Sequence, residues 1–419
     1  MNSSTHEVVV IGGGIVGLSC AYYARKRGFS VTVVDPEDDR AKASYGNAGV
    51  LAACEYLPVG TPQLIRAIPK MLVSRDSPLA LRWRYLPTLA PWLLRFIASS
   101  TPGRVEQNAL ALRSLLQLSI AEHKSLASNV DANSLLREVG WVKACETEQE
   151  YQKLQAERDQ LQSLGVRMAA LSSSDIDELA PCLKGIFARG TMFSDCMQIR
   201  NPGAYLERII LACTTAGVKF IHGTVRDFLF SGQLAAAALT QGRVIHGGTF
   251  VVAAGAWSKH LAKKLGENVY LDTERGYHAM LKVGDADLLK APVLWHEKSV
   301  VLSQQTHGVR ITSSAEFAGL EAPPRYDLLD RTVNAIRDAA PALAVPIASR
   351  WLGFRPSTPD SLPVLGRTSI RPNCFLAFGH GHLGLTLGPI TGKLLAQSIA
   401  GDRPSVDLKP FSASRFNRF

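Results

Sequence analysis

The chain has 419 residues, of which 46% are hydrophobic and 20% are charged, and its formal net charge is +10. This length allows two domains with separate cores, and the composition excludes a disordered or fibrous protein. No recognised nucleic-acid-binding module or long basic tract occurs, so we expect no nucleic-acid partner. The charge favours an anionic small substrate or an anionic membrane surface. Basicity that serves solubility alone remains the alternative for most of these side chains.

The start of the chain and its cysteines predict a cytoplasmic protein. The first strand is expected at Val8, which leaves no room for a signal peptide, and no apolar run of about 18 residues predicts a transmembrane helix. The 7 cysteines are dispersed without a C-x-x-C pair, as is typical of reduced thiols. No spacing among the 10 histidines predicts a metal site.

The stretch 8–35 has the pattern of a nucleotide-binding βαβ unit. A β-branched run predicts a buried parallel strand over 8–11. The apolar spacing that follows predicts a helix over 15–27, and a second strand is expected over 31–34.

Three glycines with the spacing G-x-G-x-x-G join this first strand to the helix. Gly12 allows the tight turn, Gly14 lets the backbone approach a pyrophosphate, and Gly17 lets helix and strand pack closely. The phosphates would meet the free N–H groups at the positive end of the helix dipole. Asp35, at the tip of the second strand, can accept a hydrogen bond from a ribose 2′-hydroxyl and would repel the 2′-phosphate of NADP.

Two further segments before residue 100 are unusual in composition. The loop 43–49 contains small residues and two glycines, which favours a backbone that lies against a ligand over a simple turn. The segment 64–97 contains six Lys or Arg side chains against one acid, Asp76, together with aromatic residues and four prolines. Such a segment can lie in a membrane interface, and a lid or a packed subdomain edge is an equal alternative.

The rest of the chain predicts mixed helices and short strands. Helices are expected over 104–128, 146–164, 201–216, 325–339 and 389–400. Strands are expected over 218–222, 224–230, 234–239, 243–246, 250–253, 277–283, 300–303, 309–313 and 374–378. The strand 250–253 runs into small residues and a helix, as the first strand does. This return to the opening pattern indicates a discontinuous nucleotide-binding domain.

Five blocks together resemble the D-amino-acid oxidase superfamily of FAD-dependent amine oxidoreductases, and within it the bacterial D-amino acid dehydrogenases, including the D-hydroxyproline dehydrogenases. The blocks are VVVIGGGIVGLSCAYYARKRG, SYGNAGVLA, ERGYH, GFRPSTPDSLPVLG and GHGHLGLTLGPITGKLLA. The resemblance implies an α/β fold with a discontinuous Rossmann-type FAD-binding domain and an α+β substrate domain built on an antiparallel sheet. The FAD-binding domain would comprise 1–55, 200–265 and 345–419, and the substrate domain 56–199 and 266–344.

The resemblance also implies the residues that contact FAD. They are Gly12, Gly13, Gly14, Ile15, Val16, Gly17, Asp35, Ser44, Asn47, Ala48, Gly49, Val225, Ala254, Gly255, Gly381, His382, Leu383, Gly384, Leu385 and Thr386.

For the substrate, the resemblance singles out Arg355. A planar guanidinium holds a carboxylate through two parallel hydrogen bonds, although an isolated arginine beside a proline turn could equally serve a structural ion pair. Tyr277 resembles the phenol that shares the carboxylate, and both residues are the expected catalytic pair. His278 and His382 are further pocket candidates, although His382 stands where some relatives carry an arginine and a lone histidine is often structural.

The implied reaction is oxidation of a small D-amino acid, with D-proline and cis-4-hydroxy-D-proline among the expected substrates. Hydride transfer from Cα to flavin N5 would give an imino acid. A membrane quinone or the respiratory chain is the expected electron acceptor, with 64–97 as a peripheral contact on the inner face of the cytoplasmic membrane. Two alternatives remain open, namely a sarcosine or glycine oxidase-like enzyme that uses oxygen and a redox-silent FAD-binding subunit.

Overall fold

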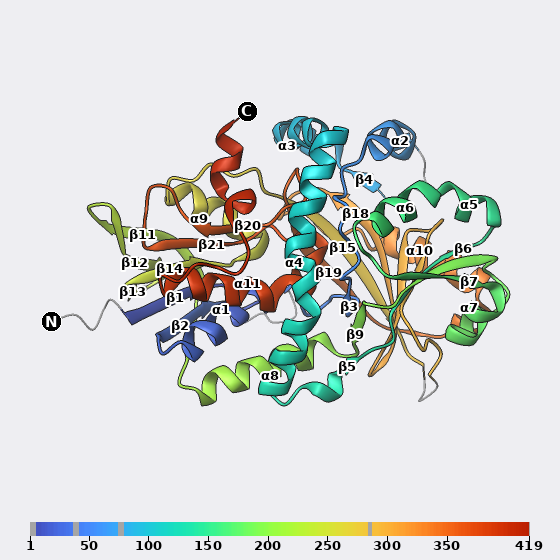
Figure 1. Cartoon of the computed structure of the whole chain (residues 1–419), viewed down its shortest axis with the longest axis horizontal. Helices are drawn as coiled ribbons and strands as arrows, with labels where there is room; N and C mark the ends of the chain where they lie inside the picture. The colour runs from blue at the N-terminus through green and yellow to red at the C-terminus, as the bar shows by residue number, and fades with distance from the viewer. Residues whose placement is uncertain (1–5, 37–41, 74–78, 284–286, 419) are drawn as a thin grey trace.

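The computed structural model describes residues 6–36, 42–73, 79–283 and 287–418. Three residues of the segment 64–97 that entered its prediction, Arg75, Asp76 and Pro78, lie outside the described residues. The described part has two large sheets, with the long helix α4 (Pro102–Asn129) running between them (Figure 1).

A six-stranded sheet carries the N-terminal unit and confirms the predicted parallel βαβ arrangement. Its order is β10-β2-β1-β14-β21-β20, and only the edge strand β20 runs antiparallel to its neighbour. The strands are β1 (Glu7–Ile11), β2 (Ser30–Asp35), β10 (Lys219–His222), β14 (Thr249–Val252), β20 (Val364–Arg367) and β21 (Cys374–Phe378). Val8 and Val10 pack toward one hydrophobic cluster. Val9 and Ile11 pack toward a second cluster on the other face, so this strand is apolar throughout.

One face of the parallel sheet is covered by three helices, α1 (Ile15–Lys26), α8 (Pro202–Thr215) and α11 (Gly384–Ile399). Two glycines of α11 allow it to lie directly on α1. A β-carbon at Gly388 would lie 2.7 Å from Ile15 Cγ1, and one at Gly392 would lie 2.7 Å from Ser19 Cβ. Gly388 contacts Ile15, and Gly392, four residues later, contacts Ser19, also four residues later. The two helices therefore run in the same direction, and their N-termini lie at the same end.

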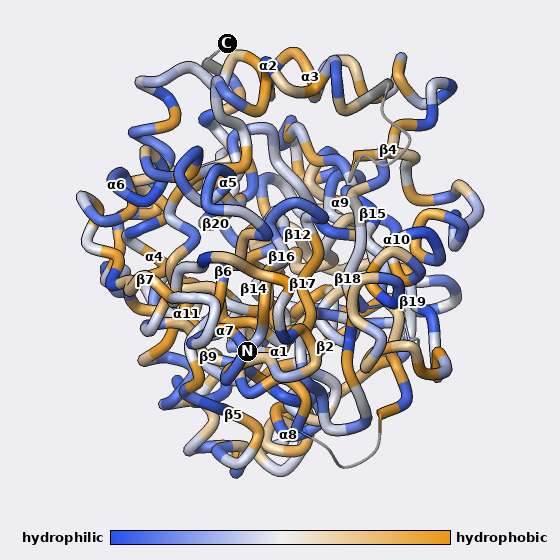
Figure 2. The backbone as a smooth tube through the Cα atoms, turned by 90° about the vertical axis from the view of Figure 1, so that its right-hand side faces the viewer, coloured by the Kyte–Doolittle hydropathy of each residue, from blue (hydrophilic) through white to orange (hydrophobic). Residues whose placement is uncertain are grey.

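The second sheet has nine strands in the order β19-β15-β18-β17-β16-β6-β8-β7, with β4 also paired to β18. These strands are β4 (Leu79–Leu81), β6 (Trp141–Cys145), β7 (Met168–Ser172), β8 (Arg189–Phe193), β15 (Asp272–Leu281), β16 (Val293–Trp295), β17 (Val300–Gln305), β18 (Gly308–Phe317) and β19 (Ile347–Ser357). Most pairings are antiparallel, as expected, but β16–β6 and β18–β4 are parallel. Helix α10 (Tyr326–Ala339) covers one face of the sheet, and Figure 2 shows the apolar strands in the interior.

The predicted α/β fold is thus confirmed, whereas the domain boundaries stay a prediction. Strand β19 falls inside the range 345–419 but pairs along its length with β15 of the second sheet. The remaining strands form two small sheets of three strands each. They consist of β11 (Val225–Ser231), β12 (Leu234–Thr240) and β13 (Arg243–His246), and of β3 (Val50–Leu51), β5 (Leu136–Arg137) and β9 (Met197–Ile199).

The single helix predicted over 146–164 is wrong, because the chain forms α5 (Glu148–Lys153) and α6 (Gln155–Ser163) with a break at Leu154. The Arg158 guanidinium donates a 2.7 Å hydrogen bond to the Tyr151 carbonyl oxygen at this break. The other short helices are α7 (Ser173–Leu179) and α9 (Ser258–Lys264).

The segment 64–97 is anchored to the second sheet over its second half. It forms α2 (Pro62–Val73), β4 and α3 (Leu86–Ser99), and the two helices lie together at one end of the molecule (Figures 1 and 2). Tyr85 donates to the Asp272 carboxylate at 3.0 Å, and Trp92 Nε1 donates to the Ser357 carbonyl oxygen at 3.1 Å. No helix in the described ranges has the length and apolar character needed to cross a bilayer.

Candidate active site

The first turn of the βαβ unit requires its glycines. Gly12 has a φ of +113°, and a β-carbon there would lie 2.6 Å from the carbonyl carbon of Ala253. A β-carbon at Gly17 would lie 2.9 Å from the carbonyl carbon of Gly12. Both substitutions would therefore separate α1 from the strands β1 and β14.

The N-terminus of α1 is arranged to receive an anion. Gly14 is the N-cap and supplies no side-chain cap, and the first turn carries no acid. A β-carbon at Gly14 would meet only Ser44 Oγ, at 3.5 Å, so the backbone is open to a ligand. Ile15 N donates to Ser44 Oγ at 3.1 Å. Val16 follows in the same turn, where backbone N–H groups favour phosphate.

Asp35 lies beside this turn at the tip of β2. Its Oδ2 accepts a 2.6 Å hydrogen bond from Gly13 N, and its Oδ1 forms a 2.8 Å ion pair with Lys42. The carboxylate is thereby held at the carboxyl edge of the parallel sheet, which is the position where this fold contacts a ribose.

Val225, Ala254 and Gly255 lie at the same edge. His222 is the register partner of Asp35, and Val225 follows it after one turn. Ala254 and Gly255 follow β14, whose last residue pairs with Ile11 immediately before the glycine turn. Residues from three separate stretches of sequence therefore meet at one edge of the parallel sheet.

The loop after the βαβ unit is held against the second sheet by its backbone. The Ala48 carbonyl oxygen accepts hydrogen bonds from Ser303 Oγ at 2.8 Å and from Gln305 Nε2 at 2.9 Å. Asn47 Oδ1 accepts from Gly49 N at 2.8 Å, and Gly49 has a φ of +80°. The loop thus bridges the nucleotide-binding turn and the second sheet.

His278 supports the same loop through its Nδ1. Its Nδ1 lies 2.9 Å from the Gly46 carbonyl oxygen, and its ring stacks on Trp351 at 5.0 Å between centroids. Burial lowers the pKa of His278 to about 3, with nearby Arg310 acting in the same direction, so the ring is neutral and Nδ1–H donates. Arg310 donates in turn to the Asn47 carbonyl oxygen.

The glycine-rich C-terminal loop, 381–386, leads into the N-terminus of α11, which lies beside the start of α1. Thr386 Oγ1 accepts a 3.1 Å hydrogen bond from Ala52 N. Gly381 has a φ of +53°, Leu383 and Leu385 are buried, and Gly384 begins the helix.

Sequence reasoning missed His123, which supports this turn from α4. Its Nε2 lies 2.9 Å from the Leu385 carbonyl oxygen and 3.2 Å from that of Thr386, and its Nδ1 lies 3.1 Å from the Tyr205 hydroxyl. Burial lowers the pKa of His123 to about 4 against the opposing effect of these backbone bonds. A histidine inside a helix gives no local sign of such distant partners.

Arg355 lies on the face of the second sheet that carries the loop 43–49. It pairs in register with Glu274, and a β-carbon at Gly276 would lie 2.5 Å from the Arg355 Cζ. The glycine of the ERGYH block therefore makes room for the guanidinium. Burial lowers the pKa of Arg355, and the Glu274 carboxylate opposes this shift.

The expected pairing of Tyr277 with Arg355 is corrected by the structure. Tyr277 is buried on the opposite face of β15, where its hydroxyl donates to Glu316 Oε2 at 2.6 Å and accepts from Arg325 N at 3.0 Å. Its ring packs edge-on against Tyr326 of α10. Side chains alternate between the two faces of a strand, so Tyr277 points away from the face that Glu274 and Gly276 share.

His382 lines a small cavity. The cavity lining includes Leu57, Leu112, Glu274, His380, His382 and Leu383. Desolvation lowers the pKa of His382, while the carboxylates of Glu55 and Glu274 act in the opposite direction. Glu55 itself forms a 2.8 Å ion pair with Lys143.

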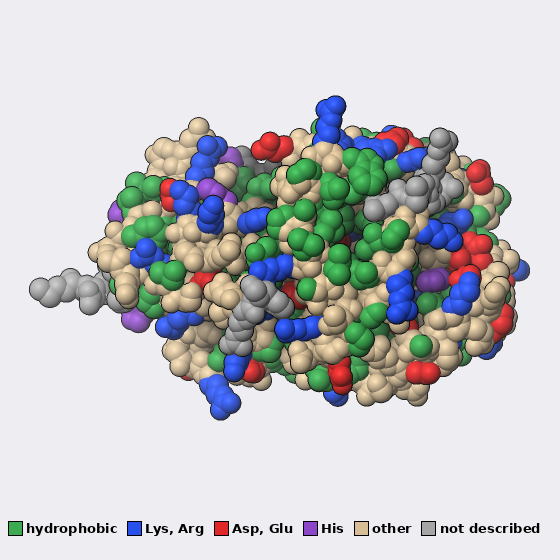
Figure 3. Space-filling model, turned by 90° about the horizontal axis from the view of Figure 1, so that it is seen from above, with side chains coloured by type: hydrophobic (Ala, Val, Ile, Leu, Met, Phe, Trp, Pro, Cys, Tyr) green, Lys and Arg blue, Asp and Glu red, His purple; other side chains and the backbone are tan. Residues whose placement is uncertain are grey.

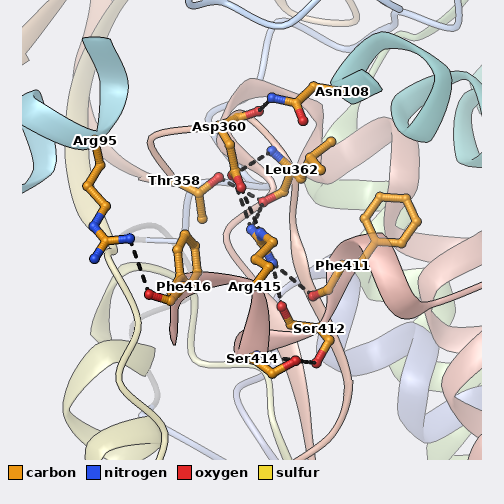
Figure 4. Close-up of polar contacts among 10 residues, drawn as sticks. All are labelled: Arg95, Asn108, Thr358, Asp360, Leu362, Phe411, Ser412, Ser414, Arg415 and Phe416. Atoms are coloured by element: carbon orange, nitrogen blue, oxygen red, sulfur yellow. Dashed lines mark hydrogen bonds and ion pairs between the residues drawn. The ribbon is translucent and has the colours of Figure 1, made fainter. Parts of the chain in front are cut away.

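A bidentate ion pair fixes the loop that follows Arg355. Arg415 Nε and Nη2 lie 2.7 and 3.1 Å from the Asp360 carboxylate oxygens, and Nη2 also donates to the Leu362 carbonyl oxygen at 2.7 Å (Figure 4). Thr358 Oγ1 donates to the same carbonyl oxygen, and Asn108 Nδ2 donates to that of Asp360. The C-terminus thus clamps the G-F-R-P block in place.

These residues fit a bound dinucleotide. The open glycine turn, the uncapped start of α1, the carboxylate of Asp35 and the N-terminus of α11 lie together at the carboxyl edge of the parallel sheet. Of the substrate candidates, Arg355 and His382 lie near one another, His278 supports the loop, and Tyr277 lies elsewhere.

Comparison with known proteins agrees with this geometry. The family described as FAD dependent oxidoreductase matches residues 7–398. A D-amino-acid oxidase of Bradyrhizobium diazoefficiens is 33% identical over 98% of this chain and 99% of that protein. A D-amino acid dehydrogenase of Helicobacter pylori is 28% identical over 97% of this chain and 98% of that protein. The crystal structure of glycine oxidase from Geobacillus kaustophilus superimposes with a TM-score of 0.76 at 22% identity, covering 98% of this chain and 99% of that chain. This chain belongs to the family of FAD-dependent oxidoreductases.

Proposed function

We propose that this protein is a D-amino acid dehydrogenase that oxidises a small D-amino acid at Cα to the imino acid. The observation that carries the proposal is the Arg355 guanidinium, which stands over Gly276 on the sheet face that carries the loop 43–49 and acts on His382 from nearby. The names of the relatives support D-amino acids as the substrate class. D-Proline and cis-4-hydroxy-D-proline are the first compounds to test.

FAD, when bound, accepts the hydride and thus supplies the redox chemistry. The residues proposed to hold it are Gly12, Gly13, Gly14, Ile15, Val16, Gly17, Asp35, Ser44, Asn47, Ala48, Gly49, Val225, Ala254, Gly255, Gly381, His382, Leu383, Gly384, Leu385 and Thr386. The N–H groups at the starts of α1 and α11 would face its anionic and polar groups.

The chain's own contribution is to bind and orient the substrate. Arg355 would bind the carboxylate through two hydrogen bonds, which restricts rotation about the carboxylate axis and fixes Cα. His278 and Arg310 would keep the cofactor loop in place from the second sheet. Leu57, Leu112 and Leu383 line the cavity with apolar groups that exclude water.

We further propose that electrons leave to a quinone in a membrane that the protein touches through residues around α3. Trp83, Leu94 and Ile97 are 64%, 69% and 51% exposed, and Figure 3 shows hydrophobic side chains gathered on this face with Lys and Arg at its margin. Exposed apolar anchors beside cations suit an anionic bilayer surface. Oxygen is the competing acceptor, which the name of the Bradyrhizobium relative favours.

Anaerobic reduction of the purified holoenzyme tests the proposal. The flavin absorbance is followed after addition of D- and L-amino acids, sarcosine and both hydroxyproline epimers. We expect bleaching by D-amino acids and reoxidation by a soluble quinone that outpaces reoxidation by air. Bleaching by sarcosine or glycine alone, with peroxide formed in air, would support the oxidase instead. A flavin that no amine reduces would indicate a redox-silent subunit.

A further inference from the structure

The residue paired with Arg355 carries the opposite charge. Glu274 of β15 is the register partner of Arg355 in β19, and directly opposed residues have Cβ atoms about 4.5–5.5 Å apart. Glu274 and Gly276 are two positions apart and share one face, and Gly276 lies beneath the guanidinium. An anion and a cation thus stand side by side on the face that carries the cofactor loop.

Glu274 and Arg355 act on each other through space, but neither forms a direct ion pair in the described part of the chain. In the described ranges, no hydrogen bond and no ion pair within 4.0 Å involves the Glu274 carboxylate or the Arg355 guanidinium. The other acid near His382, Glu55, differs in this respect, because Lys143 lies 2.8 Å from it. Half-buried charges without close partners are costly, and a ligand that carries both complementary charges would offset that cost.

Glu274 also lies at the cavity beside His382. The same cavity is lined by residues 379–383, which include His382 and lead into α11. Three charges of the second sheet act on His382, namely those of Glu274, Arg355 and Lys143. The carboxylate is therefore on the side of the site where the cofactor and substrate would meet.

We propose that Glu274 binds the α-ammonium group of the substrate whose carboxylate is bound by Arg355. An α-amino acid carries its carboxylate and its ammonium group on one carbon, and the Glu274–Arg355 pair presents the complementary charges in the same close spacing. The inference rests on the proposed function. It goes beyond it by assigning selection for zwitterionic α-amino acids, with a primary or secondary amine, over simple carboxylates.

A pair of unreactive ligands of equal shape tests this assignment on the holoenzyme. 2-Aminoisobutyrate has no hydrogen on Cα and cannot be oxidised there, and pivalate replaces its ammonium group by a methyl group. Binding of each is measured from the change in flavin absorbance. In Glu274→Gln we expect the dissociation constant of 2-aminoisobutyrate to rise about 10- to 100-fold, the effect of one charged hydrogen bond, while that of pivalate changes little.

Arg355→Met is the matched comparison, because it removes the cation and should weaken both ligands. Equal effects of Glu274→Gln on both ligands, or no effect on either, would overturn the inference. The inference would also be overturned if Glu274→Gln bound 2-aminoisobutyrate as tightly as wild type but oxidised D-lysine more slowly. Glu274 would then bind a cationic substrate side chain. Failure of the proposed function has a different signature, because the wild-type flavin would not be reduced by any amino acid. FAD content and thermal midpoint establish that each variant is folded.

Discussion

Gly392 of α11 lies directly against Ser19 of α1, with no room for a β-carbon between them. This contact places the start of α11 beside the glycine turn of α1, so both helix N-termini lie at the same edge of the parallel sheet. We expect Gly392→Val to lower stability by about 1–3 kcal/mol or more through overpacking and to weaken FAD retention. Thermal unfolding and FAD content check it. The control is Gly103→Ala, where a β-carbon meets nothing within 4 Å; a Gly392→Val protein as stable and as yellow as that control would contradict the packing.

Arg355→Met should reduce substrate affinity while FAD stays bound. The loss of one bidentate charged contact is worth about 2–4 kcal/mol, or about 30- to 1000-fold in kcat/KM. Arg355→Lys should not restore the activity, because an ammonium group lacks the planar fork. The matched control is Arg350→Met on the same strand, which removes only a surface ion pair with Asp330. Steady-state kinetics with an artificial electron acceptor provide the measurement.

Tyr277→Phe distinguishes the observed position of this phenol from the one expected from the resemblance. Removing the hydroxyl deletes the hydrogen bonds to the buried Glu316 carboxylate, which keeps its ion pairs with Arg275 and Arg82, and to the Arg325 N–H, at a cost of about 1–3 kcal/mol in unfolding free energy. KM should change by less than about threefold, because no contact with the substrate is lost. Chemical denaturation and kinetics are measured together. A large rise in KM at unchanged stability would return Tyr277 to the substrate site.

His123 should make the protein sensitive to acid. Its pKa is lowered to about 4 in the folded state by burial, so the unfolded chain takes up a proton first as the pH falls below about 6.5. The contribution of neutral His123 to the free energy of unfolding is therefore complete above that pH. As the pH falls toward 4, the contribution decreases by up to about 1.4 kcal/mol per pH unit. His123→Gln should have a shallower pH dependence of unfolding than wild type. The exposed His246→Gln should not, and an equal slope in all three proteins would exclude the effect.

The exposed apolar residues around α3 should mediate membrane binding. Trp83→Asp combined with Leu94→Asp should abolish co-flotation with vesicles of anionic phospholipid, whereas added salt should weaken wild-type binding by screening. Leu211→Asp combined with Val244→Asp introduces the same charges at comparably exposed positions elsewhere and should leave flotation intact. Docking through this surface would be refuted if the wild-type protein did not float with the vesicles. It would also be refuted if both double variants lost flotation.

The sequence alone was enough for the βαβ unit, because its signals are local. The β-branched run of β1 is buried on both faces, the positive φ of Gly12 requires glycine, and the cap position of Gly14 follows from its place at the helix start. The same locality explains why the strand at 374–378 was predicted at its observed bounds. The resemblance carried by five such blocks then pointed to the FAD-dependent family.

Only the tertiary structure decided what lies around the substrate position. Nearly every residue of β15 is buried, so no alternation of polar and apolar residues reveals that Glu274 and Tyr277 face opposite sides. The partners of His123 and of Arg415 lie 262 and 55 residues away in the sequence. Pairing of β15 with β19 is what brings Glu274 beside Arg355. Register between distant strands is fixed by packing of the whole sheet, and a single sequence does not record it.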